Sequence, residues 1–202
     1  MKLDAKSTIE TGKAILGIEF GSTRIKAVLI DQENKPIAQG SHTWENQLTD
    51  DLWTYSTEAV WYGIQDCYAD LRSNVKNQYN TEIETLAAIG ISAMMHGYMA
   101  FNEKAEILVP FRTWRNTNTG QAAAILSDLF VYNIPLRWSI SHLYQVILDD
   151  AKHVKDIDYL TTLAGYVHWQ ITGEKVLGIG DASGMLPIDP NTKNYSADMV
   201  AK

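Results

Sequence analysis

The stretch that decides the fold is Ile15-Leu16-Gly17-Ile18-Glu19-Phe20-Gly21-Ser22-Thr23-Arg24-Ile25-Lys26. It joins an apolar run, residues 14–20, to a second apolar run, residues 25–30, through a short polar turn. This order predicts a strand, a tight turn and a second strand. Residues 36–43 add a third strand, so the beginning of the chain is expected to form an antiparallel meander.

The turn between the first two strands carries groups that suit a phosphate. Glu19 closes the first strand with a carboxylate, which can hold Mg²⁺ through water. Gly21 is followed by the hydroxyl residues Ser22 and Thr23, so backbone N–H and side-chain O–H groups can approach phosphate oxygens. An ordinary β-hairpin with a Gly-Ser-Thr turn explains the same residues without a ligand. The turn by itself therefore leaves both interpretations open.

After the meander, the spacing of apolar residues becomes typical of a helix and then again typical of strands. Ser56 is a suitable N-cap for a helix that runs to about residue 76. Residues 86–91 form the next expected strand, and residues 98–102 are expected to continue the sheet after a corner. One face of the helix is apolar at spacings of three and four, which makes its cysteine a core thiol. That face consists of Val60, Ile64, Cys67, Leu71 and Val75.

The second half of the chain is richer in helix. Thr119 is expected to cap a helix through about residue 130, and a weaker helix is expected near residues 143–149. A third helix ends at Gly173, although residues 159–163 equally suit a buried strand. No Pro-, Gly- or Ser-rich linker divides the chain. We expect one domain over residues 14–202, preceded by a polar extension, residues 1–13.

Composition narrows the classes of function. The chain has 17 Lys and Arg against 24 Asp and Glu, a formal net charge of −7, which works against binding a nucleic acid. Residues 1–13 contain no apolar run that could act as a signal peptide, so a cytoplasmic protein is expected. Residues 85–101 lack charged side chains, but glycines and His96 interrupt them, and two strands joined by a corner explain the run without a membrane span.

The turn motif, acidic-x-Gly-Ser, resembles the first phosphate motif of actin, hexokinase and the FGGY carbohydrate kinases. Further stretches, in the same order along the chain, resemble the FGGY family and its xylulose kinases in particular. They are Ile91-Ser92-Ala93-Met94-Met95-His96-Gly97, Val109-Pro110-Phe111-Arg112-Thr113-Trp114-Arg115-Asn116, Ile171-Thr172-Gly173-Glu174 and Gly180-Asp181-Ala182-Ser183-Gly184-Met185. The resemblance implies an α/β domain of the ribonuclease H-like, actin/hexokinase type, with a mixed five-stranded sheet and flanking helices.

The resemblance also implies a phosphate site for ATP at the turn. Gly21, Ser22 and Thr23 would contact the phosphates. Arg24 and Lys26 can screen phosphate charge or can simply face solvent, and Lys26 is favoured because actin-type motifs carry Lys at the matching position. Glu19 would hold Mg²⁺ through water. The family usually has Asp there, and the extra methylene of Glu moves the carboxylate about 1.5 Å further out.

A sugar site is implied at the Met-His pair. His96 would bind a sugar hydroxyl through a ring nitrogen. Met95 would cover the apolar face of the sugar, or only pack in the core. Trp114 offers a flat surface and Asn116 an amide, although either residue can instead brace the corner.

The implied reaction is transfer of the γ-phosphoryl group of ATP to a hydroxyl of a pentulose or related sugar or polyol. The resemblance covers only the N-terminal domain of such a kinase. No residue after Gly184 matches the Gly-rich stretch with the catalytic Asp, so the chain alone is expected to have little or no activity. Its expected partners are the sugar, the C-terminal kinase domain and, as an open alternative, a second copy of the chain. A non-catalytic actin-superfamily module that binds a sugar or a partner remains the competing hypothesis.

Overall fold

The computed structural model describes residues 4–202, and the chain divides into two compact units. Unit 1 contains residues up to Asn46 together with Ser56–Ala93, and unit 2 contains Gln47–Tyr55 and Met94–Lys202. Each unit is described separately. The expected domain of residues 14–202 and its boundary with the polar extension remain predictions.

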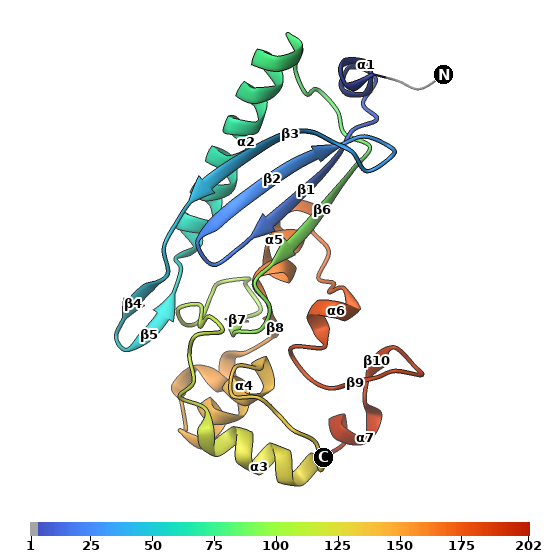
Figure 1. Cartoon of the computed structure of the whole chain (residues 1–202). Coiled ribbons are helices and arrows are strands. Elements are labelled where there is room, and N and C mark those ends of the chain that lie inside the picture. The colour runs from blue at the N-terminus through green and yellow to red at the C-terminus, as the bar shows by residue number, and fades with distance from the viewer. Residues whose placement is uncertain (1–3) are drawn as a thin grey trace. The chain divides into compact units, whose positions relative to one another are not determined.

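Unit 1 is built on a sheet of four strands in the described part of the chain. The strands are β1 (Ile15–Phe20), β2 (Arg24–Ile30), β3 (Pro36–Thr43) and β6 (Ala88–Ala93), in the order β3-β2-β1-β6 (Figure 1). β1 runs antiparallel to β2 and parallel to β6, and β2 runs antiparallel to β3. This arrangement confirms the expected meander, and it confirms that the next strand follows a helix.

Helix α2 (Thr57–Tyr79) lies along one face of this sheet (Figure 1). The Ser56 hydroxyl accepts a hydrogen bond from the Ala59 N–H at 3.1 Å, which confirms the expected N-cap. All five residues of the expected apolar face are buried, and Cys67 has no exposed surface. Burial raises the pKa of the Cys67 thiol to about 11, so the side chain is a core thiol as expected.

The helix approaches the sheet so closely that β3 needs a glycine. A Cβ atom on Gly40 would lie 2.4 Å from the Cys67 carbonyl oxygen and 2.4 Å from the Leu71 nitrogen, both backbone atoms of α2. In β1 and β2, buried residues alternate with more exposed ones, which is the pattern of a sheet covered on one face. On the other face, the end of the hairpin next to the β1–β2 turn carries the exposed polar side chains of Glu19, Arg24 and Lys26.

The expected polar extension includes a short helix, α1 (Ala5–Glu10), with Asp4 as its N-cap. The Asp4 carboxylate accepts a hydrogen bond from the Ser7 N–H at 2.7 Å. Thr8 and Ile9 are buried. Part of the extension therefore packs on the protein, while its residues 1–3 lie outside the described residues.

The expected five-stranded sheet is wrong by one strand. The segment expected to continue the sheet contains β7 (Met99–Phe101), which pairs instead with β8 (Tyr159–Thr161) in a separate two-stranded sheet. The reason lies in the corner before β7, where His96 and Gly97 have φ angles of 69° and 94°. Two successive residues in this left-handed region cannot continue an extended strand.

In unit 2, the third expected helix begins only at residue 163, because the preceding residues form β8. Gly173, with φ of 81°, ends this helix as expected. Thr119 precedes α3 as expected, but its hydroxyl donates to the Leu136 carbonyl oxygen and does not cap the helix. The remaining elements are β4 (Gln47–Thr49), β5 (Leu52–Thr54), α3 (Gly120–Phe130), α4 (Ser139–Leu148), a 3-10 helix (Lys152–Asp156), α5 (Leu163–Thr172), α6 (Ile179–Ala182), β9 (Ile188–Asp189), β10 (Asn194–Tyr195) and α7 (Ala197–Val200).

Aromatic packing joins β7 to α5 in the core of unit 2. The Phe101 ring is stacked on Tyr166, with ring centroids 5.5 Å apart, and meets Trp169 edge-on at 5.2 Å. Across residues 4–202, none of the helices combines the length and the apolar character that a membrane span requires.

Candidate functional site

The predicted metal and phosphate residues Glu19 and Lys26 stand directly opposite each other in the β1–β2 register. The Lys26 Nζ atom lies 3.4 Å from the Glu19 Oε2 atom. Both side chains are about half exposed, at 55% for Glu19 and 53% for Lys26. The register of the β1–β2 hairpin is what brings these two predicted residues together.

The loop between them is closed by one backbone bond. The Gly21 N–H donates to the Arg24 carbonyl oxygen at 3.0 Å, so Ser22 and Thr23 form the tip, and both are exposed. A Cβ atom on Gly21 would lie 2.9 Å from that carbonyl oxygen. Glycine is therefore required here by a close approach of backbone atoms, and the approach leaves the two hydroxyl residues at the surface.

Trp44, which the sequence analysis did not single out, braces this loop from the end of β3. Its indole N–H donates to the Gly21 carbonyl oxygen at 2.7 Å, and its backbone N–H donates to the Thr23 carbonyl oxygen at 3.2 Å. Its buried ring packs near Phe20, with centroids 6.0 Å apart. Nothing in the local sequence marks this role, because a tryptophan after a strand usually signals packing.

In unit 2, the predicted sugar residue His96 is held by groups distant in sequence. Its Nδ1 atom lies 3.3 Å from the Gly184 carbonyl oxygen. Its ring is stacked on Trp138, with centroids 6.5 Å apart and planes inclined by 20°. Burial lowers the pKa of His96, and the charge on Arg137 lowers it further, whereas the Gly184 carbonyl and Asp181 act in the opposite direction. The imidazole is therefore neutral at pH 7.

Asp181 is a second titratable group near this corner, and the sequence analysis gave it no role. Its carboxylate accepts a hydrogen bond from the Thr162 hydroxyl. Burial raises the pKa of Asp181, although the hydrogen bond from the Thr162 hydroxyl, and His96 when it is protonated, act against this rise. A signal that could have found it was present, since Asp181 lies in one of the motifs that resemble the FGGY family.

The other two predicted sugar residues differ in exposure. Trp114 is 40% exposed, as is suitable for a surface that receives a ligand, and Met95 is similarly exposed at 41%. Asn116 is buried, and its amide oxygen accepts from the Trp53 N–H at 2.9 Å. Its amide nitrogen donates to the carbonyl oxygens of Trp53 and Thr113, at 2.8 and 3.0 Å. The structure therefore gives Asn116 the bracing role that the sequence left open.

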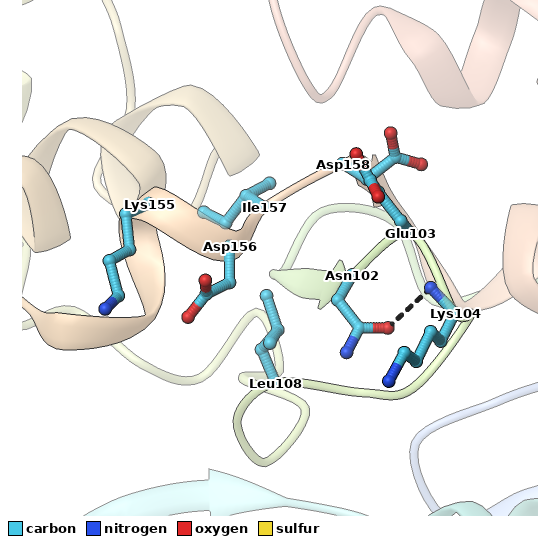
Figure 2. Close-up of a pocket in the computed structure, with 8 residues that line it drawn as sticks. All are labelled: Asn102, Glu103, Lys104, Leu108, Lys155, Asp156, Ile157 and Asp158. Carbon is cyan, nitrogen blue, oxygen red and sulfur yellow. Dashed lines mark hydrogen bonds between the residues drawn. The ribbon is translucent and has the colours of Figure 1, made fainter.

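The predicted site residues are divided between the two units, and Trp114 and Asn116 belong to unit 2. The turn with Glu19 and Lys26 belongs to unit 1, and the corner with Met95 and His96 belongs to unit 2. A polar surface pocket of about 430 Å³ in unit 2 contains none of the predicted residues (Figure 2). Its lining consists of Asn102, Glu103, Lys104, Leu108, Lys155, Asp156, Ile157 and Asp158.

Comparison with solved structures identifies the class of fold. The chain superimposes on a ligand-bound xylulose kinase from Lactobacillus acidophilus with a TM-score of 0.77 and 18% sequence identity, over 93% of this chain and 39% of the other. A gluconate kinase from the same organism gives a TM-score of 0.78 at 18% identity, over 93% and 39% of the two chains. The fold is therefore the α/β, actin/hexokinase-like fold that was expected, with four strands in place of five.

Sequence comparison identifies the family. The chain is 19% identical over 193 residues to a xylulose kinase from Klebsiella pneumoniae, covering 92% of this chain and 39% of that protein. Residues 14–202 match the N-terminal domain of the FGGY family of carbohydrate kinases. The chain belongs to this family. It spans about two fifths of the length of the curated relatives that it matches.

Proposed function

We propose that the chain is the N-terminal, substrate-binding part of an ATP-dependent kinase that phosphorylates a pentulose or a related sugar or polyol. The observation that carries the proposal is the hairpin loop, where Gly21 leaves Ser22 and Thr23 exposed beside a paired carboxylate and ammonium group. The xylulose kinases and the gluconate kinase among the similar proteins support a sugar as the acceptor.

At the loop, Gly21, Ser22 and Thr23 would offer donors to the phosphates of ATP. Lys26 would share its ammonium charge between Glu19 and the phosphates. The exposed Glu19 carboxylate suits Mg²⁺ held through water, since this ion binds to few protein ligands and retains waters and phosphate oxygens. When bound, the ion neutralises negative charge on the phosphates.

At the corner, the sugar would contact His96 through a ring nitrogen and Met95 through its apolar side chain. The exposed face of Trp114 would receive C–H groups of the sugar. Asn116 would act indirectly, because its amide is bonded to the backbone of Trp53 and Thr113 and holds the segment that carries Trp114.

We further propose that this chain alone transfers little or no phosphate. Phosphoryl transfer to an alcohol needs a carboxylate that accepts the hydroxyl proton. The resemblance to FGGY kinases implies that this base is an Asp in a Gly-rich stretch, and the 202 residues contain no match to that stretch after Gly184. The chain would therefore bind and position substrates without a base to complete the reaction.

A coupled ADP-release assay with ATP, Mg²⁺ and a panel of ketoses and polyols tests this proposal on the 202-residue chain. We expect no turnover above background, and weak pentulose binding by isothermal titration. Turnover that follows the folded protein and disappears in Glu19→Ala would contradict the proposed inactivity. Unaided sugar binding in the micromolar range would instead favour the alternative function, a non-catalytic sugar-binding module.

A further inference from the structure

The contact between His96 and Gly184 determines which nitrogen of the imidazole carries its hydrogen. The Gly184 carbonyl oxygen lies 3.3 Å from Nδ1 and can only accept a hydrogen bond. Nδ1 must therefore be the protonated nitrogen when this bond forms. In a neutral imidazole the other nitrogen, Nε2, then has a lone pair and no hydrogen.

The Gly184 carbonyl is itself held in place by its neighbours in unit 2. The Gly184 N–H donates to the Asp181 carbonyl oxygen at 3.0 Å, and the Ser139 N–H approaches the Gly184 carbonyl oxygen at 3.4 Å. The Ser139 hydroxyl donates to the Gly97 carbonyl oxygen at 2.6 Å, next to His96 in the chain. The same residue of α4 thus fixes both sides of the contact.

The His96 ring also occupies space that any side chain at position 184 would need. A Cβ atom on Gly184 would lie 2.6 Å from His96 Nδ1, 3.0 Å from Cε1 and 3.2 Å from the Met95 Cε atom. Trp138 is stacked on the same imidazole. A methyl group at position 184 would therefore displace both side chains of the Met-His pair.

We propose that Gly184 is a positioning residue for the sugar site, and that it makes His96 Nε2 a hydrogen-bond acceptor for one ligand hydroxyl. This inference rests on the proposed function, in which His96 binds the sugar. It deepens that function by assigning the direction of the bond: the sugar donates and the protein accepts. A ligand with only lone pairs at that position, such as a fluorine or a carbonyl oxygen, would be rejected.

Gly180 provides a matched control four residues away in the same segment. A Cβ atom on Gly180 would meet no atom within 4 Å. We expect Gly184→Ala to weaken pentulose binding about tenfold or more, which corresponds to about 1.4 kcal/mol, and Gly180→Ala to leave it unchanged. Nuclear magnetic resonance titration measures weak affinities, and circular dichroism shows whether both variants fold.

A measurement on the wild-type chain keeps the proposal testable even if Gly184→Ala does not fold. In a chain labelled with ¹⁵N at histidine, we expect His96 to show a protonated Nδ1 and an unprotonated Nε2. Gly180→Ala should retain this pattern, and a folded Gly184→Ala should lose it. A wild-type His96 with its hydrogen on Nε2 would overturn the role of Gly184, while leaving sugar binding as such intact.

Sugar analogues test the direction of the bond. Among the monodeoxy and monodeoxyfluoro analogues of xylulose, we expect one position at which both changes weaken binding equally, about tenfold. In Gly184→Ala, the analogues changed at that position should bind with the same affinity as the parent sugar. If every monodeoxyfluoro analogue, whichever position carries the fluorine, binds as well as the parent sugar, the inference is overturned. If wild type binds none of the sugars, the proposed function fails, and the ¹⁵N pattern still decides the role of Gly184.

Discussion

The β1–β2 loop of unit 1, where we propose that ATP phosphates bind, and the Met95–His96 corner of unit 2 are built in opposite ways. In the loop, one hairpin register pairs Glu19 with Lys26 across a few residues of chain. In the corner, His96 meets a carbonyl oxygen 88 residues further along the sequence. The difference shows that a motif contained in one hairpin can be recognised from its amino-acid sequence alone. The contacts between distant segments, such as that of His96 with Gly184, cannot be predicted in this way.

The two regions also differ in whether their functional side chains are exposed or contribute to the packing of the protein. The loop presents charged side chains that are about half exposed, so they add little to stability. Trp44 braces the loop, and α2 packs tightly against β3, which is the strand beside β2. In unit 2, partly buried polar groups form the corner itself, so changes there are expected to affect both the fold and the proposed sugar binding.

The largest expected effect comes from the tight contact between α2 and β3 in unit 1. Gly40→Ala should lower the free energy of unfolding by about 3 kcal/mol, because its methyl group would overlap backbone atoms of α2. Urea denaturation measures the loss. Gly90→Ala, in β6 of the same unit, is the matched control, since its Cβ atom would meet nothing within 4 Å. Equal stability of the two variants would show that the hairpin does not depend on this contact.

Acid should destabilise unit 2 through a buried histidine. His142 is fully buried, and burial together with the charge on Arg112 lowers its pKa to about 3. The unfolded chain binds this proton near pH 6.5, so between pH 6.5 and about 3 the unfolded state holds more protons than the native state. Stability should therefore fall, as the pH decreases below 6.5, by about 1.4 kcal/mol per pH unit.

Comparison with His142→Leu isolates this contribution. In the described residues neither ring nitrogen of His142 has a hydrogen-bond partner, so the substitution removes no such bond there. Urea denaturation at pH 7, 6 and 5 should show a smaller loss of stability in the variant than in wild type. Identical pH dependence would mean that His142 is not a source of acid sensitivity.

Trp44→Phe should have an intermediate effect on the loop. The change removes the indole N–H that donates to the Gly21 carbonyl oxygen and retains an aromatic ring. We expect a loss of about 1 kcal/mol in unfolding free energy and weaker binding of Mg·ATP, measured by calorimetry. Trp114→Phe is the comparison, because Trp114 lies in the other unit and is 40% exposed. If both variants bind nucleotide as wild type does, Trp44 is not needed to hold the loop.

The smallest expected effect on stability comes from the ion pair. Lys26→Met should change the unfolding free energy by less than about 0.5 kcal/mol, because both partners are more than half exposed. The same variant should reduce Mg·ATP affinity, since a cation next to the phosphates is lost. Arg24→Met provides a control at a neighbouring exposed cation of the same strand. Unchanged affinity in Lys26→Met would remove Lys26 from the proposed phosphate site.

The sequence predicted features that depend on local periodicity or on single capping residues. Two apolar runs joined by a polar turn indicated the meander, Ser56 indicated the start of α2, and Gly173 indicated the end of α5. The ordered motifs also indicated the family, which the match over residues 14–202 confirms. These features can be predicted because each depends on residues within a few positions of one another.

Only the tertiary structure decided how distant segments combine. The pairing of β7 with β8 reduced the expected five-stranded sheet to four strands, since left-handed residues at His96 and Gly97 redirect the chain. The buried amide of Asn116 became a brace, and Gly184 became the partner of His96. Partner choice over long sequence separations depends on which backbone and side-chain groups packing brings together. Hydrophobic period and turn propensity do not contain that information.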